Sequence, residues 1–431
     1  MKKVLVLIFV ISLFAYLFAG CAKKAEAPAP STNNSAAGET KKDEQKPAES
    51  KGEVVELSVW HYFGSTDGPI FEGMCEEFNK SQNKIVVKPE FVPREELLKQ
   101  YTIGLVADKL PDVGMIDNPD HASFAAMGLF EDITDRVKQW GGGDQFFEGP
   151  MKSAIYKGRI YGLPQNSNCL ALWYDVDMLK AAGVEVPQTW DELAEAAKKL
   201  TKDGVYGLAI SAPKNEEGTF QYLPWLLSAG ADIEHLDSPE AIKSMAYLAA
   251  LVKNGYMSKE VINWTQADAE KQFATGKAAM MINGPWNIPA VKQDAPNKKW
   301  AVAKVPKDKT FASVLGGENF GIIKGHKVDA GWEFLKYISS PEMSKKYAEG
   351  TGKFSPRKDV MQDSTVFKSD PILSVFVDQL QYAMPRGPHP KWPEISTAIS
   401  TALQEALTGA KSAEQAMKDA QAKVSEMLKS K

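Results

Sequence analysis

Aromatic side chains in this chain gather where strand-like runs of sequence end. Flat aromatic faces can pack on the C–H faces of sugar rings, while nearby carboxylates, amides and guanidinium groups bind hydroxyls. Trp286 follows "MMINGP" and Trp392 lies in "PRGPHPKWPEI", so we expect turn-forming neighbours to expose both rings. Trp173 lies inside the apolar run "CLALWY", which favours core packing. Trp286 and Trp392 are therefore the first candidates for ligand contact.

The other reactive side chains show none of the common catalytic patterns. There is no Walker-type phosphate loop, no dinucleotide fingerprint and no GxSxG elbow, and "GGENFG" (316–321) has the wrong glycine spacing. The five His are scattered, and Cys75 and Cys169 stand alone and are expected to be buried, so we predict no metal site and no cofactor. The pattern indicates a protein that is not an enzyme, although two distant carboxylates could still form a catalytic pair.

The composition is that of a soluble globular body. The chain has 431 residues, 44% of them hydrophobic and 25% charged, which is enough for two domains with separate cores. Its formal net charge of −4 supplies no basic field for a nucleic acid, so we predict no nucleic-acid partner.

Strand-like and helix-like segments must position these side chains, and they alternate along the chain. Alternation of this kind predicts an α/β fold with a mostly parallel sheet. Three later helices carry capping signals, at Thr189 with Glu192, at Ser238-Pro239 and at Ser340-Pro341, and Ser412 opens an amphipathic helix over 413–428. The first segments are predicted as strands over 54–60, 84–92 and 111–117 and as helices over 69–80 and 94–108.

The N-terminus has the layout of an export signal. A basic start precedes an uncharged apolar run over 4–20, and Ala19-Gly20-Cys21 resembles the lipobox of bacterial lipoproteins. In that family the cysteine receives lipid, so we expect residues 1–20 to be removed and Cys21 to anchor the protein to a membrane outside the cytoplasm. A short transmembrane anchor is the alternative. Residues 21–52 contain no aromatic residue and no Leu, Ile or Val, which predicts a disordered tether.

From about Val54 to the C-terminus, the body resembles the extracellular solute-binding proteins of the sugar-binding, maltose-binding-protein-like group, which are receptors of ABC importers. The resemblance is carried in order by "VWHYFG", "LPDVGMID", "FAAMGLFEDIT", "IYGLPQNSNCLALWYDVDMLKAAGVEVPQTWDEL", "FATGKAAMMINGPW", "GGENFGI" and "KFSPRKDV". It implies a two-lobe periplasmic-binding-protein fold, each lobe a mixed sheet flanked by helices, with a sugar held in the cleft between them. It also implies closure about a hinge and delivery to the transmembrane permease subunits, and we expect a monomer.

Carried onto this sequence, the resemblance divides the body at three crossings. The first lobe would hold residues 53–165 and 317–350, and the second lobe residues 166–313 and 354–431. The crossings would lie near 166–170, 314–318 and 350–354.

The resemblance also implies ligand-binding positions. Trp286 and Trp392 would stack on sugar rings, His61 and Tyr62 would occupy the first cleft loop, and Phe220 and Gln221 a cleft loop of the second lobe. Caps and turn bonds are the alternative role of the polar positions. The remaining candidates are Asp117, Asn118, Asp120, Asn168, Gly317, Glu318, Asn319, Arg357 and Arg386.

Two alternatives to a sugar receptor stay open. The "WH" pair Trp60-His61 with Arg357 and Arg386 would also suit a receptor for a phosphorylated polyol such as glycerol phosphate. A lipid-anchored glycan hydrolase is a third possibility, for which no nucleophile or acid/base motif is found.

Overall fold

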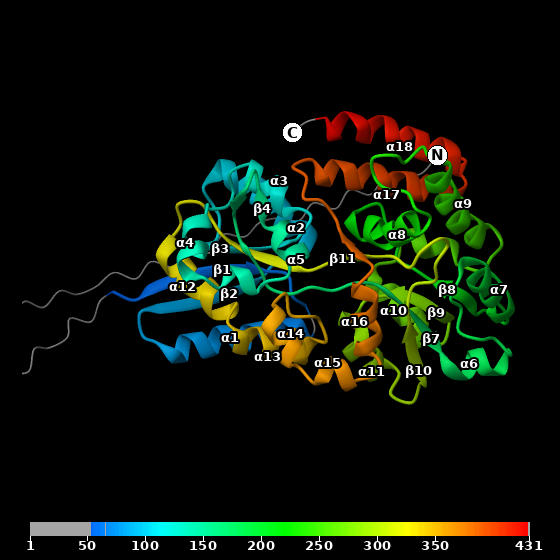
Figure 1. The fold of residues 1–431 in the computed structure, drawn as a ribbon, viewed down its shortest axis with the longest axis horizontal. Coiled ribbons are helices and arrows are strands. Elements are labelled where there is room, and N and C mark those ends of the chain that lie inside the picture. Colours follow the sequence, from blue (N-terminus) through cyan, green and yellow to red (C-terminus); the bar gives the residue numbers. More distant parts are fainter. Residues whose placement is uncertain (1–52, 65, 430–431) are drawn as a thin grey trace, which may run out of the picture. The chain divides into compact units, whose positions relative to one another are not determined.

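A computed structural model describes residues 53–64 and 66–429, whose strands form two main β-sheets (Figure 1). The first sheet has the strand order β2-β1-β3-β12-β6. β1 is parallel to β2 and to β3, whereas β12 is antiparallel to β3 and to β6. These strands are β1 (Val55–His61), β2 (Ile85–Phe91), β3 (Val113–Asp117), β6 (Leu163–Pro164) and β12 (Glu318–Ile322).

The second sheet has the order β10-β7-β9-β8, and only β8 and β9 run parallel. The sheets are therefore mixed, as the family resemblance implies, and the mostly parallel sheet expected from simple alternation is wrong. For example, β12 joins the first sheet only after the chain has passed through the second sheet, and it runs in the direction opposite to β3. The strands are β7 (Ala171–Asp175), β8 (Tyr206–Ala209), β9 (Ala278–Asn283) and β10 (Trp300–Ala303).

Helices cover both faces of each sheet, because alternate residues of a strand point to opposite faces. In β7, Leu172 belongs to one buried cluster with residues of α7, α8 and α9, whereas Ala171 and Trp173 belong to another with residues of α10 and α16. The first sheet is covered by α1, α12 and α13 on one face and by α2 and α3 on the other. The structure therefore has two lobes, each a mixed sheet between layers of helices.

The helices agree closely with the sequence signals. The capping box at Thr189 and the caps at Ser238, Ser340 and Ser412 are all formed, and α18 spans the predicted residues. The first-lobe helices are α1 (Asp67–Ser81), α2 (Arg94–Ala107), α3 (His121–Ala126), α4 (Thr134–Trp140), α5 (Glu148–Ser153), α12 (Val328–Ile338) and α13 (Pro341–Thr351), with the 3-10 turn η1 (Gly143–Gln145). The others are α6 (Val176–Ala181), α7 (Trp190–Leu200), α8 (Glu216–Ser228), α9 (Pro239–Lys253), α10 (Gln266–Ala274), α11 (Ile288–Asp294), α14 (Lys358–Asp363), α15 (Val366–Ser369), α16 (Leu373–Leu380), α17 (Trp392–Thr408) and α18 (Ala413–Leu428), with η2 (Lys259–Ile262) and η3 (Pro285–Asn287).

The chain passes between the lobes along segments that pair with one another. Ser167 exchanges two backbone hydrogen bonds of 2.8 Å with Phe354, and Asn168 exchanges bonds of 3.1 and 2.9 Å with Gly316. A short parallel pair, β11 (Ser313–Leu315) with β13 (Ala383–Pro385), continues beside them, and β4 (Ile155–Tyr156) pairs with β5 (Arg159–Ile160) elsewhere. Gly317 has φ +139°, and a Cβ there would lie 2.3 Å from the Asn166 carbonyl oxygen. Only glycine fits this close approach of two crossings.

Two further expectations concern burial and membranes. Cys75, Cys169 and Trp173 are buried, as predicted. Within residues 53–64 and 66–429, no helix has the length and apolar character needed to cross a membrane. The predicted signal peptide, Cys21 and the tether lie outside the described residues.

Candidate functional site

A cleft with a volume of about 420 Å³ is lined by residues of both lobes. Eight of the fifteen ligand-binding positions proposed from the sequence line it: Tyr62, Asp117, Asn168, Phe220, Trp286, Gly317, Glu318 and Arg386. Among the lining residues that the sequence reasoning missed are Asp67, Arg94, Glu216, Glu217, Thr265, Gln266, Asn287, Gly316 and Lys353.

A tightly bonded turn places Trp286 at the cleft. The strand β9 ends at Asn283, whose Nδ2 donates to the Gln266 carbonyl at 2.9 Å and whose own carbonyl accepts the Trp173 indole N–H at 3.0 Å. A Cβ on Gly284 would lie 1.9 Å from the Trp286 ring, so the ring folds back over a glycine. Trp286 stays partly exposed on η3, as expected, with its ring centroid 6.1 Å from that of Phe220.

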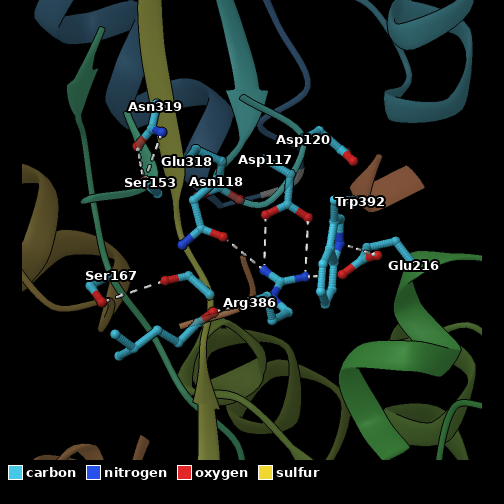
Figure 2. Close-up of polar contacts among 12 residues, drawn as sticks. Asp117, Asn118, Asp120, Ser153, Ser167, Glu216, Glu318, Asn319, Arg386 and Trp392 are labelled. Carbon is cyan, nitrogen blue, oxygen red and sulfur yellow. Dashed lines mark hydrogen bonds and ion pairs between the residues drawn. The ribbon is translucent and has the colours of Figure 1, made fainter. Parts of the chain in front are cut away.

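Arg386 makes hydrogen bonds to residues of both lobes at the cleft (Figure 2). Its Nη2 donates to Asp117 Oδ1 at 3.0 Å and to Asn118 Oδ1 at 3.1 Å, both at the end of β3. Its Nη1 donates to Glu216 on α8, and its guanidinium lies 4.4 Å from the Phe220 ring centroid. Burial alone would lower the pKa of Arg386, but the Asp117 and Glu216 carboxylates raise it, so the guanidinium stays charged.

A second arginine, Arg94 of the first lobe, also binds the Asp117 carboxylate. Arg94 Nη2 donates to Asp117 Oδ2 at 3.2 Å and to Asp120 Oδ2 at 3.0 Å. Burial raises the pKa of Asp120 to about 7 against the opposing effect of Arg94. Asp120 thus lies behind the cleft wall, where it holds Arg94 in place.

Lys353 also lines the cleft, and it immediately precedes Phe354, which pairs with Ser167. Its Nζ lies 2.6 Å from Asp67 Oδ2 and 3.5 Å from Glu318 Oε2, and its side chain is buried. Asn166 Nδ2 donates to the same Glu318 oxygen at 2.5 Å. Burial raises the pKa of Glu318, an effect that Lys353 opposes.

Two cleft-lining side chains carry hydrogen-bonding groups that no described residue satisfies. They are the buried hydroxyl of Tyr62, from the first lobe, and the Nδ2 of Asn287, from the second. Burial and then the Glu318 and Asp117 carboxylates raise the pKa of Tyr62 well above its usual value, so the phenol keeps its proton. Buried polar groups in proteins are nearly always paired, so each of these two lacks a partner that a ligand or a water molecule could supply.

Trp392 does not have the exposure that the sequence predicted. It opens α17 and is only 1% exposed, and its indole N–H donates to Glu216 Oε2 at 3.0 Å (Figure 2). Phe220 and Gln221 lie within helix α8, not in the cleft loop that the family resemblance implied. Gln221 donates to the Ile282 carbonyl at 3.2 Å and supports β9.

Three more predicted positions point away from the cleft. His61 ends β1 and is fully buried among the rings of Phe63, Phe71 and Phe91, where burial lowers its pKa to about 4. Arg357 donates to the Asp359 carboxylate and to the Ser339 carbonyl. Asn319 bonds to Ser153 within the first lobe (Figure 2). The imidazole and Arg357 that suggested a phosphate site therefore do not face the cleft.

The missed residues share a physical reason. Arg94, Glu216 and Lys353 lie inside or beside helices whose charged residues read as solvated faces, and their partners are far away in sequence. The sequence signal that could have identified Lys353 is the segment "KFSPR", which is part of the family resemblance and begins at this residue.

Comparison with known proteins gives consistent matches. Residues 73–375 match the family model described as bacterial extracellular solute-binding protein. The chain is 27% identical over 389 residues to a protein of Brucella abortus named only as a binding protein, covering 87% of this chain and 93% of that one. It is 26% identical to the maltotriose-binding protein of Pyrococcus abyssi, covering 84% of this chain and 79% of that one. A solved ABC-transporter solute-binding protein from Thermotoga lettingae, bound with alpha-D-tagatose, superimposes with a TM-score of 0.80 at 29% identity, covering 87% of this chain and all of that one.

Proposed function

The chain belongs to the family of bacterial extracellular solute-binding proteins, and from this we propose that it is the carbohydrate-binding receptor of an ABC importer. It would capture a mono- or oligosaccharide outside the cytoplasm and deliver it to the transmembrane permease, without changing the sugar chemically. Relatives named for sugars support this ligand class, among them the maltotriose-binding protein and the tagatose-bound receptor.

The observation that carries the proposal is the composition of the cleft wall. Trp286 offers a partly exposed aromatic face, and the unpaired Tyr62 hydroxyl and Asn287 amide come from opposite lobes. A sugar has apolar C–H faces and a rim of hydroxyls, so it can satisfy both kinds of surface at once. The roles of the eight cleft-lining candidates in binding follow from this proposal.

We further propose that the lobe boundaries lie where the sequence placed them, with the paired segments near 166–170, 314–318 and 350–354 as the hinge. Backbone pairs between crossings, such as Ser167 with Phe354, give the hinge a defined structure. A ligand that contacts both lobes binds only the closed form fully, so it shifts the population toward closure. The permease would then recognise the closed form. We expect the receptor to act as a monomer.

The membrane attachment is also a proposal. Lipid on Cys21 and the tether over 21–52 would hold the two-lobe body near the permease while leaving it free to turn. The location outside the cytoplasm agrees with the family.

A sugar panel tests the function directly. Tagatose, maltose, maltotriose and their galacto- and manno-counterparts are titrated while Trp fluorescence is followed, and the sugar is then recovered and analysed by chromatography. Saturable binding with recovery of unaltered sugar is expected. Binding by no member of the panel contradicts the carbohydrate assignment, and turnover of any member contradicts the receptor role in favour of a hydrolase.

A further inference from the structure

The charges that line the cleft do not balance. Three cations lie in its wall, on Arg94, Lys353 and Arg386, against a larger number of carboxylates. The carboxylates are those of Asp67, Asp117, Glu216, Glu217 and Glu318, which leaves a formal charge of −2 on the wall. The cleft therefore presents a negative field to whatever enters it.

Each of the three cations already pairs with at least two carboxylates. Arg386 is shared by Asp117 and Glu216. Arg94 is shared by Asp117 and Asp120, and Lys353 by Asp67 and Glu318. A phosphate or carboxylate on a ligand would have to compete with these carboxylates for the cations, and it would add negative charge beside them. Displacing Glu216 from Arg386 would also leave a buried carboxylate without its counter-charge, which is strongly destabilising.

Glu217 is in the opposite situation. Its Oε2 accepts the Ser211 hydroxyl at 3.2 Å and the Gln266 backbone N–H at 3.1 Å, and within the described part of the chain it forms no ion pair. It lines the same cleft as Trp286 and as Asn287, which is 7% exposed and whose amide nitrogen has no partner among the residues that the structure describes. Burial raises the pKa of Glu217, which a positive neighbour would reverse. Arg94 contributes only a longer-range field here, since its hydrogen bonds go elsewhere.

We propose that the cleft selects sugars by charge, with Glu217 as the counter-ion for a protonated amine on the ligand. A hexosamine would then bind more tightly than its neutral parent, and uronates and sugar phosphates would be rejected. This inference rests on the proposed carbohydrate function. Its physical basis is the contrast between three cations that already have carboxylate partners and one carboxylate without a cation, in a cleft that also presents an aromatic ring; a carboxylate and an aromatic face both favour an ammonium ion.

Calorimetric titration of matched sugar sets tests this selection. Glucose, galactose and mannose are compared with their 2-amino-2-deoxy derivatives, their uronates and their 6-phosphates, at a pH that keeps the amines protonated. For the hexose that binds, we expect the amino derivative to bind at least threefold more tightly and the uronate and phosphate at least tenfold more weakly. If the uronate or the phosphate binds as well as the neutral sugar, or the amino derivative binds more weakly than it, the inference is wrong and the carbohydrate function stands. If no member of any set binds although a larger sugar of the first panel does, the selection of amino sugars is wrong and the carbohydrate function stands; if no sugar of either experiment binds, both fail.

A variant separates the role of Glu217 from a general field effect. In Glu217→Gln the ratio of amino-sugar affinity to neutral-sugar affinity should fall to about one. Glu195→Gln is the matched control, since Glu195 is exposed on α7 of the same lobe and outside the cleft, and it should leave the ratio unchanged. A ratio that stays above threefold in Glu217→Gln would show that Glu217 is not the counter-ion.

Discussion

Arg386 Nη2 and Asp117 Oδ1 lie 3.0 Å apart although the two residues are separated by 269 positions in the chain. Asp117 ends the third strand of the first sheet, and Arg386 follows the strand β13 that leads into α17. Because Glu216 of the second lobe holds the other side of the guanidinium, this pair ties the lobes together at the cleft. This pair therefore links the geometry of the site to the arrangement of the two lobes.

Arg386→Met should therefore loosen the closed form. The substitution leaves Asp117 and Glu216 without their shared cation, and loss of one partner of a buried ion pair typically costs about 3–5 kcal/mol. Opening of the cleft would let water solvate both carboxylates, so we expect a larger radius of gyration in small-angle X-ray scattering and at least a tenfold loss of sugar affinity.

The matched control for this variant is Arg136→Met. Arg136 pairs with Asp329 on the surface of the first lobe, at 2.6 Å, where ion pairs contribute little. It should keep the scattering profile and the affinity of the wild type. Identical scattering and affinity in both variants would mean that Arg386 does not hold the lobes together.

Trp286→Ala should weaken sugar binding about tenfold or more while leaving the fold intact. The ring is partly exposed on the η3 turn, so its removal takes away a stacking surface and not a core element. Trp173→Ala is the contrasting variant: Trp173 is fully buried, and its loss should cost about 3–5 kcal/mol of unfolding free energy. Thermal denaturation measures the stability of both variants, and fluorescence titration measures their sugar affinity. Unfolding of Trp286→Ala, with normal affinity in the residual folded fraction, would make Trp286 a core residue.

Local sequence patterns predicted the elements well but only part of the site. Period and caps are properties of neighbouring residues, which is why Thr189, Ser340 and the C-terminal helix were predicted correctly. The prediction that Trp392 is exposed was wrong. The prolines around it suggested an open turn, whereas the ring is buried and its indole N–H donates to Glu216. Long-range ion pairs such as Lys353 with Asp67 leave no local signal.

Acid should destabilise the protein through His61. Burial among aromatic rings lowers its pKa from 6.5 to about 4, and its nearest acidic group is the half-exposed Glu72, 3.8 Å away. A depressed folded-state pKa contributes stability above pH 6.5 that is lost as the pH falls from 6.5 through 4, about 3 kcal/mol in total. His61→Phe should reduce the loss of unfolding free energy between pH 7 and pH 4 by about this amount, as measured by denaturant titration. An unchanged pH slope would mean that the pKa of His61 is the same in the folded and the unfolded protein.

Cys21→Ala should release the protein from its membrane. A single lipid-bearing cysteine at the start of the tether is the proposed anchor, and alanine cannot be acylated. Fractionation of cells that express the variant should move the protein from the membrane to the soluble extracytoplasmic fraction. Cys75→Ala, which changes a buried core thiol, should leave the distribution as it was. Retention of Cys21→Ala in the membrane fraction would contradict lipid anchoring at this residue.

The central claim is that the cleft holds a carbohydrate, and a crystal structure with the tightest-binding sugar of the panel tests it most directly. We predict a sugar ring stacked on Trp286, with hydroxyl groups bonded to Tyr62 from the first lobe and Asn287 from the second. A sugar bound outside this cleft, or bound within it with no contact to Trp286 and to only one lobe, would contradict the account.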